Sequence, residues 1–421
     1  MRDGSIPASA TTVIGQSAGH AGRGRRDRTC RAPPAGPGPP VHSRAATRHH
    51  GYMPMSTDTA ARRRRRPRRR RVPALLVIVV AGGLAIAVAF ALAAALDDDR
   101  PHGPYLIGGW TFGDRASLRR AVDAGALDEV SVDWLQSRAD GSVVAPKLDT
   151  GFIAEAKRQE CRVFVTLTDY DETQHTFDPA ISAAILKTPQ SRRRHVAAVA
   201  AWCREHEVAG VDVDWEALKA SQRNAFSAFV EELARRLHDD DRLIAVDVYP
   251  KFREPGGWDG PRSQDWERLG RAVDQFRIMT YNYSGSWSGP GPLSPPDWMH
   301  RVLAFAETQV PPRRIVMGLG FYGRDWVGDA TSDLVWSDVR AIRAARDPLQ
   351  TRTASGELRL EYRRDGDRHI AYFPDAAAIR VKARMLVEKH PRILGVYAWH
   401  MGQEDPAVWR VLKETLHTRV P

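Results

Sequence analysis

The residues that could do chemistry gather in one short segment, 209–216, which reads Ala-Gly-Val-Asp-Val-Asp-Trp-Glu. Acidic and apolar residues alternate in it, as is typical of a β-strand, so Asp212, Asp214 and Glu216 should share one face. Three like charges on a buried face are costly unless some are protonated or hydrogen-bonded. Neighbouring carboxylates also move their pKa values apart, which leaves one protonated near neutral pH. The segment therefore predicts a general acid.

The elements that would position this segment are short apolar runs that alternate with amphipathic stretches from Pro101 onward. This order predicts repeated βα units, and eight of them close into a (β/α)₈ barrel. An exposed edge strand with solvated acids is the alternative for 209–216, but its apolar face suits helices packed outside a barrel. A long interval before the last strand predicts a small α+β insertion at about 325–373. We expect strands at 105–110, 129–134, 162–168, 210–216, 243–248, 276–281, 315–321 and 395–399, and helices that include 192–207 and 221–238.

The positive charge of the chain belongs to its N-terminal part. Residues 1–100 carry 18 Arg, no Lys and 6 Asp, a balance of +12, whereas the whole chain has a formal charge of +11, so the remainder sums to −1. A nucleic-acid-binding protein carries its positive charge on the folded module that contacts phosphates. The sequence therefore argues against a nucleic-acid partner.

An apolar segment follows the arginines directly. Val72–Leu96 contains 25 residues without a charge, a length that spans a bilayer as a helix. We expect a disordered Arg-rich cytoplasmic tail (1–71), a transmembrane signal-anchor helix (72–96), a linker (97–103) and an extracellular catalytic domain (104–421), because the positive flank stays in the cytoplasm. A cleavable signal peptide is the alternative.

The three cysteines, at positions 30, 161 and 203, are too few for a disulfide scaffold. We expect Cys161 and Cys203 to be buried free thiols, with a disulfide between them as the alternative. Asp169 and Asp171 follow the third expected strand, and we expect them to cap the next helix or to be solvated, with binding of a hydroxyl as the alternative.

The segment 210–216 resembles the Asp-x-x-Asp-x-Asp-x-Glu signature of glycoside hydrolase family 18, the family of chitinases and their relatives. The likeness continues in 279–283 (Met-Thr-Tyr-Asn-Tyr), 317–323 (Met-Gly-Leu-Gly-Phe-Tyr-Gly) and 395–399 (Gly-Val-Tyr-Ala-Trp). The chain departs from the pattern at Ala209, where the first Asp is usual, and at Asn282, where many members have Asp. Three further segments are similar to the bacterial branch associated with spore and cell-wall peptidoglycan: 185–192, 290–298 and 402–406.

The resemblance implies hydrolysis of β-1,4-linked N-acetylglucosamine polymers, peptidoglycan ahead of chitin, in which the substrate supplies the nucleophile. Glu216 would act as acid and then as base. Asp214 would orient the acetamido group, and Asp212 would hydrogen-bond Asp214. The resemblance also assigns residues that bind the sugar: Tyr281 to its acetamido oxygen and Trp399 beneath its ring, with Met279 and Asn282 in the same motif as Tyr281. Trp110 and Tyr322 are aromatic residues at or just past predicted strand ends, where a glycan cleft needs platforms, and we expect them to contact the sugar there.

Two other functions share these residues. One is a non-catalytic, chitinase-like barrel that binds glycans, and the other is an endo-β-N-acetylglucosaminidase that acts on N-linked glycans. Structural roles are also open for Tyr281, whose hydroxyl could bond backbone, and for Trp399, which could pack in the core. No metal or organic cofactor is expected, because protons and an acetamido group suffice. We expect a monomer whose partners are the polysaccharide and the membrane.

Overall fold

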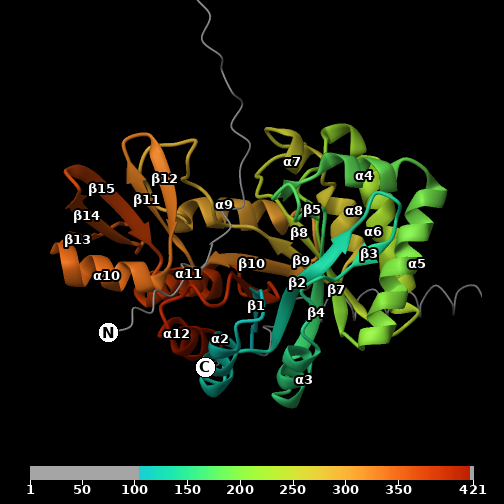
Figure 1. The fold of residues 1–421 in the computed structure, drawn as a ribbon, viewed down its shortest axis with the longest axis horizontal. Helices are drawn as coiled ribbons and strands as arrows, with labels where there is room; N and C mark the ends of the chain where they lie inside the picture. The colour runs from blue at the N-terminus through green and yellow to red at the C-terminus, as the bar shows by residue number, and fades with distance from the viewer. Residues whose placement is uncertain (1–103, 418–421) are drawn as a thin grey trace, which may run out of the picture. The chain divides into compact units, whose positions relative to one another are not determined.

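The computed structural model describes residues 104–417. At its centre lies a closed barrel of parallel strands, in which β1 pairs with both β2 and β16 (Figure 1). The predicted (β/α)₈ barrel is therefore confirmed. Its eight strands are β1 (Leu106–Thr111), β2 (Glu129–Ser137), β4 (Arg162–Thr168), β7 (Gly210–Asp214), β8 (Leu243–Val248), β9 (Gln275–Ile278), β10 (Ile315–Gly320) and β16 (Gly395–Trp399).

Helices connect the barrel strands and cover their outer face (Figure 1). The helix α5 shows how they begin: Thr188 and Ser191 form a reciprocal capping box, and Pro189 occupies the first turn, where its missing N–H costs nothing. The helices around the barrel are α2 (Arg115–Asp123), α3 (Thr150–Arg158), α4 (Pro179–Leu186), α5 (Pro189–His206), α6 (Arg223–His238), α7 (Asp259–Arg262), α8 (Trp266–Ala272), α9 (Pro296–Ala306), α11 (Ala376–Lys389) and α12 (Val408–Leu412).

The strand β7 alternates as its sequence predicts. Val211 and Val213 are fully buried, and the Trp215 ring stacks on Phe229 of α6 with a centroid distance of 4.7 Å. Burying an apolar side chain of this size contributes roughly 1.5–3 kcal/mol. These contacts fix the apolar face of β7 against the helices, so the acidic face points into the barrel.

A small α+β insertion lies between β10 and β16, where the sequence predicts one. It contains an antiparallel sheet in the order β12-β11-β15-β14-β13, with α10 against one face. Its buried Glu357 accepts hydrogen bonds from the backbone N–H groups of Leu293 and Ser294 and pairs with Lys382 of α11 at 2.8 Å, which ties the insertion to the barrel. Its elements are β11 (Gly323–Val327), β12 (Ala330–Leu334), α10 (Trp336–Arg346), β13 (Leu349–Arg352), β14 (Leu358–Arg364) and β15 (Asp367–Phe373).

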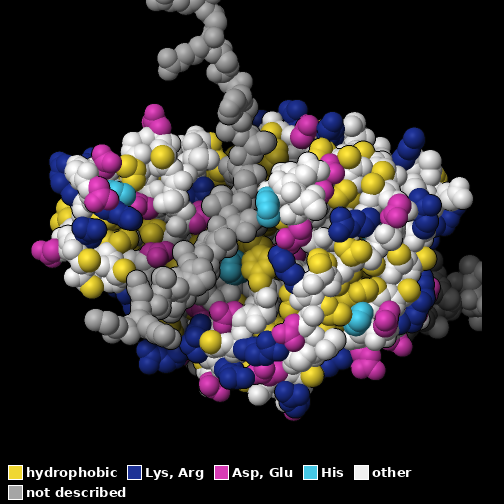
Figure 2. Space-filling view, in the orientation of Figure 1, with side chains coloured by type: hydrophobic (Ala, Val, Ile, Leu, Met, Phe, Trp, Pro, Cys, Tyr) yellow, Lys and Arg dark blue, Asp and Glu magenta, His cyan; other side chains and the backbone are white. Residues whose placement is uncertain are grey.

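Several short elements complete the described chain: β3 (Val143–Val144), β5 (Tyr170–Asp171), β6 (Thr176–Phe177), η1 (Ala220–Gln222), η2 (Pro312–Arg314) and a π-helical turn, η3 (Lys413–His417). On the face seen in Figure 2, basic and acidic side chains are interspersed rather than gathered into areas of one sign. Cys161 and Cys203 are free and buried, as predicted, and burial raises their pKa values to about 11 and about 12.

The expected membrane span, 72–96, lies outside the described residues, as do the expected tail and linker. Between residues 104 and 417, no helix is both long enough and apolar enough to cross a membrane. Three predicted strands were too long at their C-terminal ends, because β7 ends at Asp214, β9 at Ile278 and β10 at Gly320.

Candidate active site

The acidic face of β7 places its carboxyl groups at the C-terminal end of the barrel, where barrel enzymes carry their active sites. Asp212 is fully buried, Asp214 is 9% exposed, and Glu216 lies two residues beyond the strand and is half-buried. Burial raises the pKa of Glu216. Burial, followed by the negative charge of Glu216, raises the pKa of Asp214 well above its usual range. The two groups therefore compete for protons at the barrel mouth.

Glu216 is held at both its backbone and its side chain. Its N–H donates to Asp169 Oδ1 at 3.0 Å, and the N–H of Ala217 donates to Asp169 Oδ2 at 3.3 Å. The hydroxyl of Tyr249, just past β8, donates to Glu216 Oε2 at 2.6 Å. Asp169 is fully buried, and burial raises its pKa to about 8. The expectation that Asp169 caps a helix or is solvated was wrong, because it bonds the backbone that carries the proposed acid.

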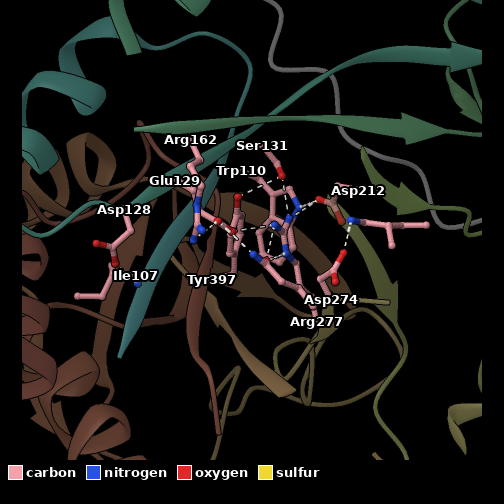
Figure 3. Close-up of polar contacts among 12 residues, drawn as sticks. Ile107, Trp110, Asp128, Glu129, Ser131, Arg162, Asp212, Asp274, Arg277 and Tyr397 are labelled. Atoms are coloured by element: carbon pink, nitrogen blue, oxygen red, sulfur yellow. Dashed lines mark hydrogen bonds and ion pairs between the residues drawn. The ribbon is translucent and has the colours of Figure 1, made fainter. Parts of the chain in front are cut away.

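Asp212 belongs to a buried polar network that crosses the barrel (Figure 3). Its Oδ2 accepts hydrogen bonds from Arg277 Nη1 at 2.6 Å and from Trp110 Nε1 at 2.7 Å. Arg277 also pairs with Glu129 at 3.0 Å, and its guanidinium lies 3.6 Å from the centre of the Tyr397 ring. The expected hydrogen bond between Asp212 and Asp214 stays a prediction. The contacts seen here tie Asp212 to a buried cation, Arg277.

Two further carboxyl groups lie near this row. Asp247 of β8 is 4% exposed, and burial together with the negative charge of Asp212 raises its pKa well above the usual range. Asp133 lies where the pairing of β2 with β4 changes register, between Val132 and Leu135. Burial raises its pKa to about 7, and the charges of Asp212 and Glu216 add to this. Sequence reasoning missed both, although Asp247 is the one acid in the otherwise apolar predicted strand 243–248.

The predicted residues Tyr281, Met279 and Trp399 lie near the carboxyl groups. Tyr281 is 6% exposed and meets the ring of Tyr322 edge-on at 6.3 Å, in a cluster that includes Met279. Burial, followed by the charge of Asp247, raises the pKa of Tyr281 well above its usual range. Its hydroxyl has no hydrogen-bond partner among residues 104–417. Trp399 is half-buried at the end of β16, where sequence reasoning predicts it.

Trp110 and Tyr322 do not fit the predicted role of sugar platforms. Trp110 is 1% exposed, because its ring packs against Tyr397 and its N–H bonds Asp212. Tyr322 is 5% exposed and donates its hydroxyl to Asn282. The side-chain Oδ1 of Asn282 also accepts a hydrogen bond from Arg324 Nη2 at 3.1 Å. Asn282 has a φ of 62°, which Asn tolerates. Between residues 104 and 417, the aromatic side chains that are about half exposed are those of Phe112, Phe252, Trp258, Tyr283 and Trp287.

A closed βα barrel with carboxyl groups of raised pKa at the end of a strand is an arrangement suited to acid-catalysed hydrolysis. The sequence profile described as "Glycosyl hydrolases family 18" matches residues 135–404. The chain therefore belongs to glycoside hydrolase family 18 and is a glycosidase. The resemblance found in the sequence is confirmed.

Curated relatives and solved structures agree with this assignment. "Uncharacterized glycosylase YvbX" of Bacillus subtilis is 21% identical over 340 residues, 79% of this chain and 98% of that protein. The cortical fragment-lytic enzyme of the same species is 25% identical over 289 residues, 66% of this chain and 65% of that protein. A chitinase structure from Chromobacterium violaceum has a TM-score of 0.69 at 25% identity and covers 75% of this chain and 100% of that one. The spore cortex-lytic enzyme SleL of Bacillus cereus shares the fold, with a TM-score of 0.68 at 19% identity over 75% of each chain.

Proposed function

We propose that this glycosidase hydrolyses β-1,4-linked polysaccharides containing N-acetylglucosamine, with Glu216 as acid and then base. The observation that carries the proposal is the position of Glu216. It is partly open to solvent, two residues past the buried Asp214, and its carboxyl accepts a hydrogen bond at one oxygen from Tyr249. Burial raises its pKa. A general acid needs both access to the substrate and a proton near neutral pH.

The substrate's N-acetyl group supplies the nucleophile in this proposal. Its carbonyl oxygen attacks the anomeric carbon while the bond to the leaving sugar breaks and Glu216 donates its proton to the leaving oxygen. This step gives an oxazolinium ring. Water then attacks the same carbon as Glu216 takes a proton from it, and the ring opens to a product with the original β configuration.

Asp214 and Tyr281 are suited to hold the acetamido group. Neither the carboxyl of Asp214 nor the hydroxyl of Tyr281 has a hydrogen-bond partner among residues 104–417, so both are available to a ligand. Burial and the negative charge of Glu216 raise the pKa of Asp214, which favours its protonated form in the free enzyme. Positive charge that develops on the acetamido group would favour the ionised carboxylate, so Asp214 would stabilise charge chiefly as the reaction proceeds.

The remaining site residues take roles that follow from their positions. Trp399, Met279 and Asn282 would contact the sugar at the barrel mouth. Asp212 would act as an anchored partner of Arg277. Trp110 would support Asp212 from within the barrel, and Tyr322 would orient Asn282.

Peptidoglycan is the substrate that we place ahead of chitin. Support comes from the names of relatives, which include cortical fragment-lytic and spore cortex-lytic enzymes, although chitinases are also among them. We further propose that 72–96 anchors the enzyme with its catalytic domain outside the cell. The apolar run and its arginine-rich flank are the support. Protease protection of the domain in intact cells would contradict this topology.

The test compares the full-length protein with its Glu216→Gln variant on purified peptidoglycan, N-acetylglucosamine oligomers and N-linked glycoprotein glycans. New reducing ends should form with the wild type, and the variant should lose about 100-fold or more of this activity. Glu205→Gln is the matched control, because Glu205 is exposed on α5, and it should keep full activity.

The outcomes also separate the alternatives. If the wild type releases only N-linked glycans, the proposed substrate is wrong and the enzyme is an endo-β-N-acetylglucosaminidase. Binding of glycans without turnover by the wild type would contradict the catalytic proposal and identify a glycan-binding protein. Equal turnover by the wild type and Glu216→Gln would remove Glu216 from its proposed role.

A further inference from the structure

We propose that Tyr249 is a positioning residue for the acid: its hydroxyl holds one carboxyl oxygen of Glu216 and leaves the other to face the substrate. This inference rests on the proposed function of Glu216. The Tyr249 hydroxyl lies 2.6 Å from Glu216 Oε2 and 3.4 Å from the Glu216 carbonyl oxygen. A phenol donates a single hydrogen, and the shorter contact takes it. The proton for the leaving group is then carried by Oε1.

Tyr249 is itself held firmly on the side away from Glu216. Its backbone N–H donates to Gln264 Oε1 at 2.9 Å, and this buried amide also donates to the carbonyl of Asp247 at 3.3 Å. The Trp258 ring packs edge-on against the Tyr249 ring at 4.6 Å. The phenol is therefore fixed by backbone and ring contacts, as a group that positions another must be.

Gly260 makes this ring packing possible. A Cβ at this position would lie 2.4 Å from the Trp258 ring and 2.7 Å from the Tyr249 ring. Both distances are shorter than real Cβ contacts, so neither ring can keep its position. Gly260→Ala would therefore shift the Tyr249 ring from its position without removing the Tyr249 hydroxyl.

Tyr249 also opposes the acidic surroundings of Glu216. Among residues 104–417 it is the side chain that donates a hydrogen bond to the Glu216 carboxyl, and this bond lowers the pKa of Glu216 while burial raises it. The buried cation Arg277 pairs with Asp212 and Glu129 instead. The titratable groups that face Glu216 from the surrounding strands are Asp133, Asp169, Asp214, Asp247 and Tyr281.

The direction of the effect follows from the donor. A hydrogen bond to the carboxylate stabilises its ionised form, so its loss lets Glu216 keep its proton to higher pH. Bonds to charged groups are strong enough to move a titration by roughly one to two pH units. The alkaline limb of kcat/KM reports the acid of the free enzyme. Removing the hydroxyl should therefore move this limb upward.

The experiment measures kcat/KM against pH for the full-length wild type and for Tyr249→Phe, on whichever glycan the wild type cleaves. The variant keeps the ring that packs on Trp258. We expect its alkaline limb to move up by roughly one to two pH units and its activity at the optimum to fall about 10- to 100-fold. Tyr105→Phe is the matched control, because the Tyr105 hydroxyl bonds the Pro391 carbonyl in an exposed position away from the carboxyl groups, and it should leave the profile unchanged.

Gly260→Ala gives a second test that does not remove the hydroxyl. It should lower activity and move the limb in the same direction as Tyr249→Phe. If the wild type is active and Tyr249→Phe has the same alkaline limb as the wild type, the role of Tyr249 is wrong and the proposed function stands. If Tyr249→Phe does not fold, an unchanged alkaline limb in a folded Gly260→Ala protein has the same meaning. A wild type inert on every glycan overturns the proposed function instead.

Discussion

Replacing Arg277 with Met tests the buried network beneath the active site. Arg277 and both of its carboxylate partners, Asp212 and Glu129, have fully buried side chains, at nitrogen–oxygen distances of 2.6 and 3.0 Å. Methionine can fill much of the space but leaves the two carboxylates without this cation. Removing one partner of a buried ion pair costs about 3–5 kcal/mol. For a domain of this size such a loss lowers Tm by roughly 10 °C.

The pH dependence of this loss is a second signature. Burial raises the pKa of Glu129, and the positive charge of Arg277 is the largest effect that opposes it. Without Arg277 the pKa should rise further. A carboxyl whose pKa is raised by folding stabilises the protein below its unfolded pKa, and this contribution is lost as pH rises through the folded pKa. The deficit of Arg277→Met should therefore grow between pH 5 and pH 8.

Urea unfolding of the full-length protein at several pH values measures both effects. Arg271→Met is the matched control, because Arg271 is 67% exposed and pairs with Glu267 on the surface of α8. Its change should stay within about 0.5 kcal/mol. The double variant Arg277→Met, Glu129→Gln should recover part of the loss, because one uncompensated charge is gone. An Arg277→Met protein as stable as the wild type, or a deficit independent of pH, would refute this reasoning.

Two other substitutions probe the carboxyl groups around Glu216. Asp169→Asn keeps one acceptor for the backbone N–H groups of Glu216 and Ala217 and loses the second. We expect kcat to fall about 10-fold and Tm to stay nearly unchanged. An unaltered kcat in steady-state assays would contradict the role of Asp169 in holding the Glu216 backbone. Asp133→Asn removes a carboxyl whose pKa is raised to about 7. Ionising a carboxyl whose pKa is raised in the folded state destabilises that state. The Asp133→Asn variant should therefore be more stable than the wild type at pH 8 and nearly as stable at pH 4. Urea unfolding midpoints that differ by the same amount at both pH values would contradict this prediction.

Local patterns were sufficient to predict the barrel and the carboxylate row. Alternation along 209–216 assigns each side chain to a face, and the stacking of Trp215 on Phe229 bears this out. The end of β7 could not be read in the same way. Glu216 leaves the strand pairing because its N–H bonds Asp169, which is 47 residues away in the chain.

Long-range partners explain the other differences between expectation and structure. Trp110 looks like a platform because it is an aromatic residue at a strand end, but its N–H meets Asp212 across 102 residues. Arg277 of β9 meets Asp212, which is 65 residues away in the chain. Tyr249 directly follows the predicted strand 243–248, and only the folded chain shows that it meets Glu216. A single sequence carries no record of such pairs.

The anomeric configuration of the first product tests the proposed chemistry most directly. The full-length enzyme would be mixed with a β-1,4-linked N-acetylglucosamine oligomer, and the new reducing end would be followed by proton NMR before mutarotation. Catalysis by Glu216 with the substrate's acetamido group predicts that the β anomer forms first. Initial formation of the α anomer would mean that water attacks directly from the opposite face, and this result would contradict the account.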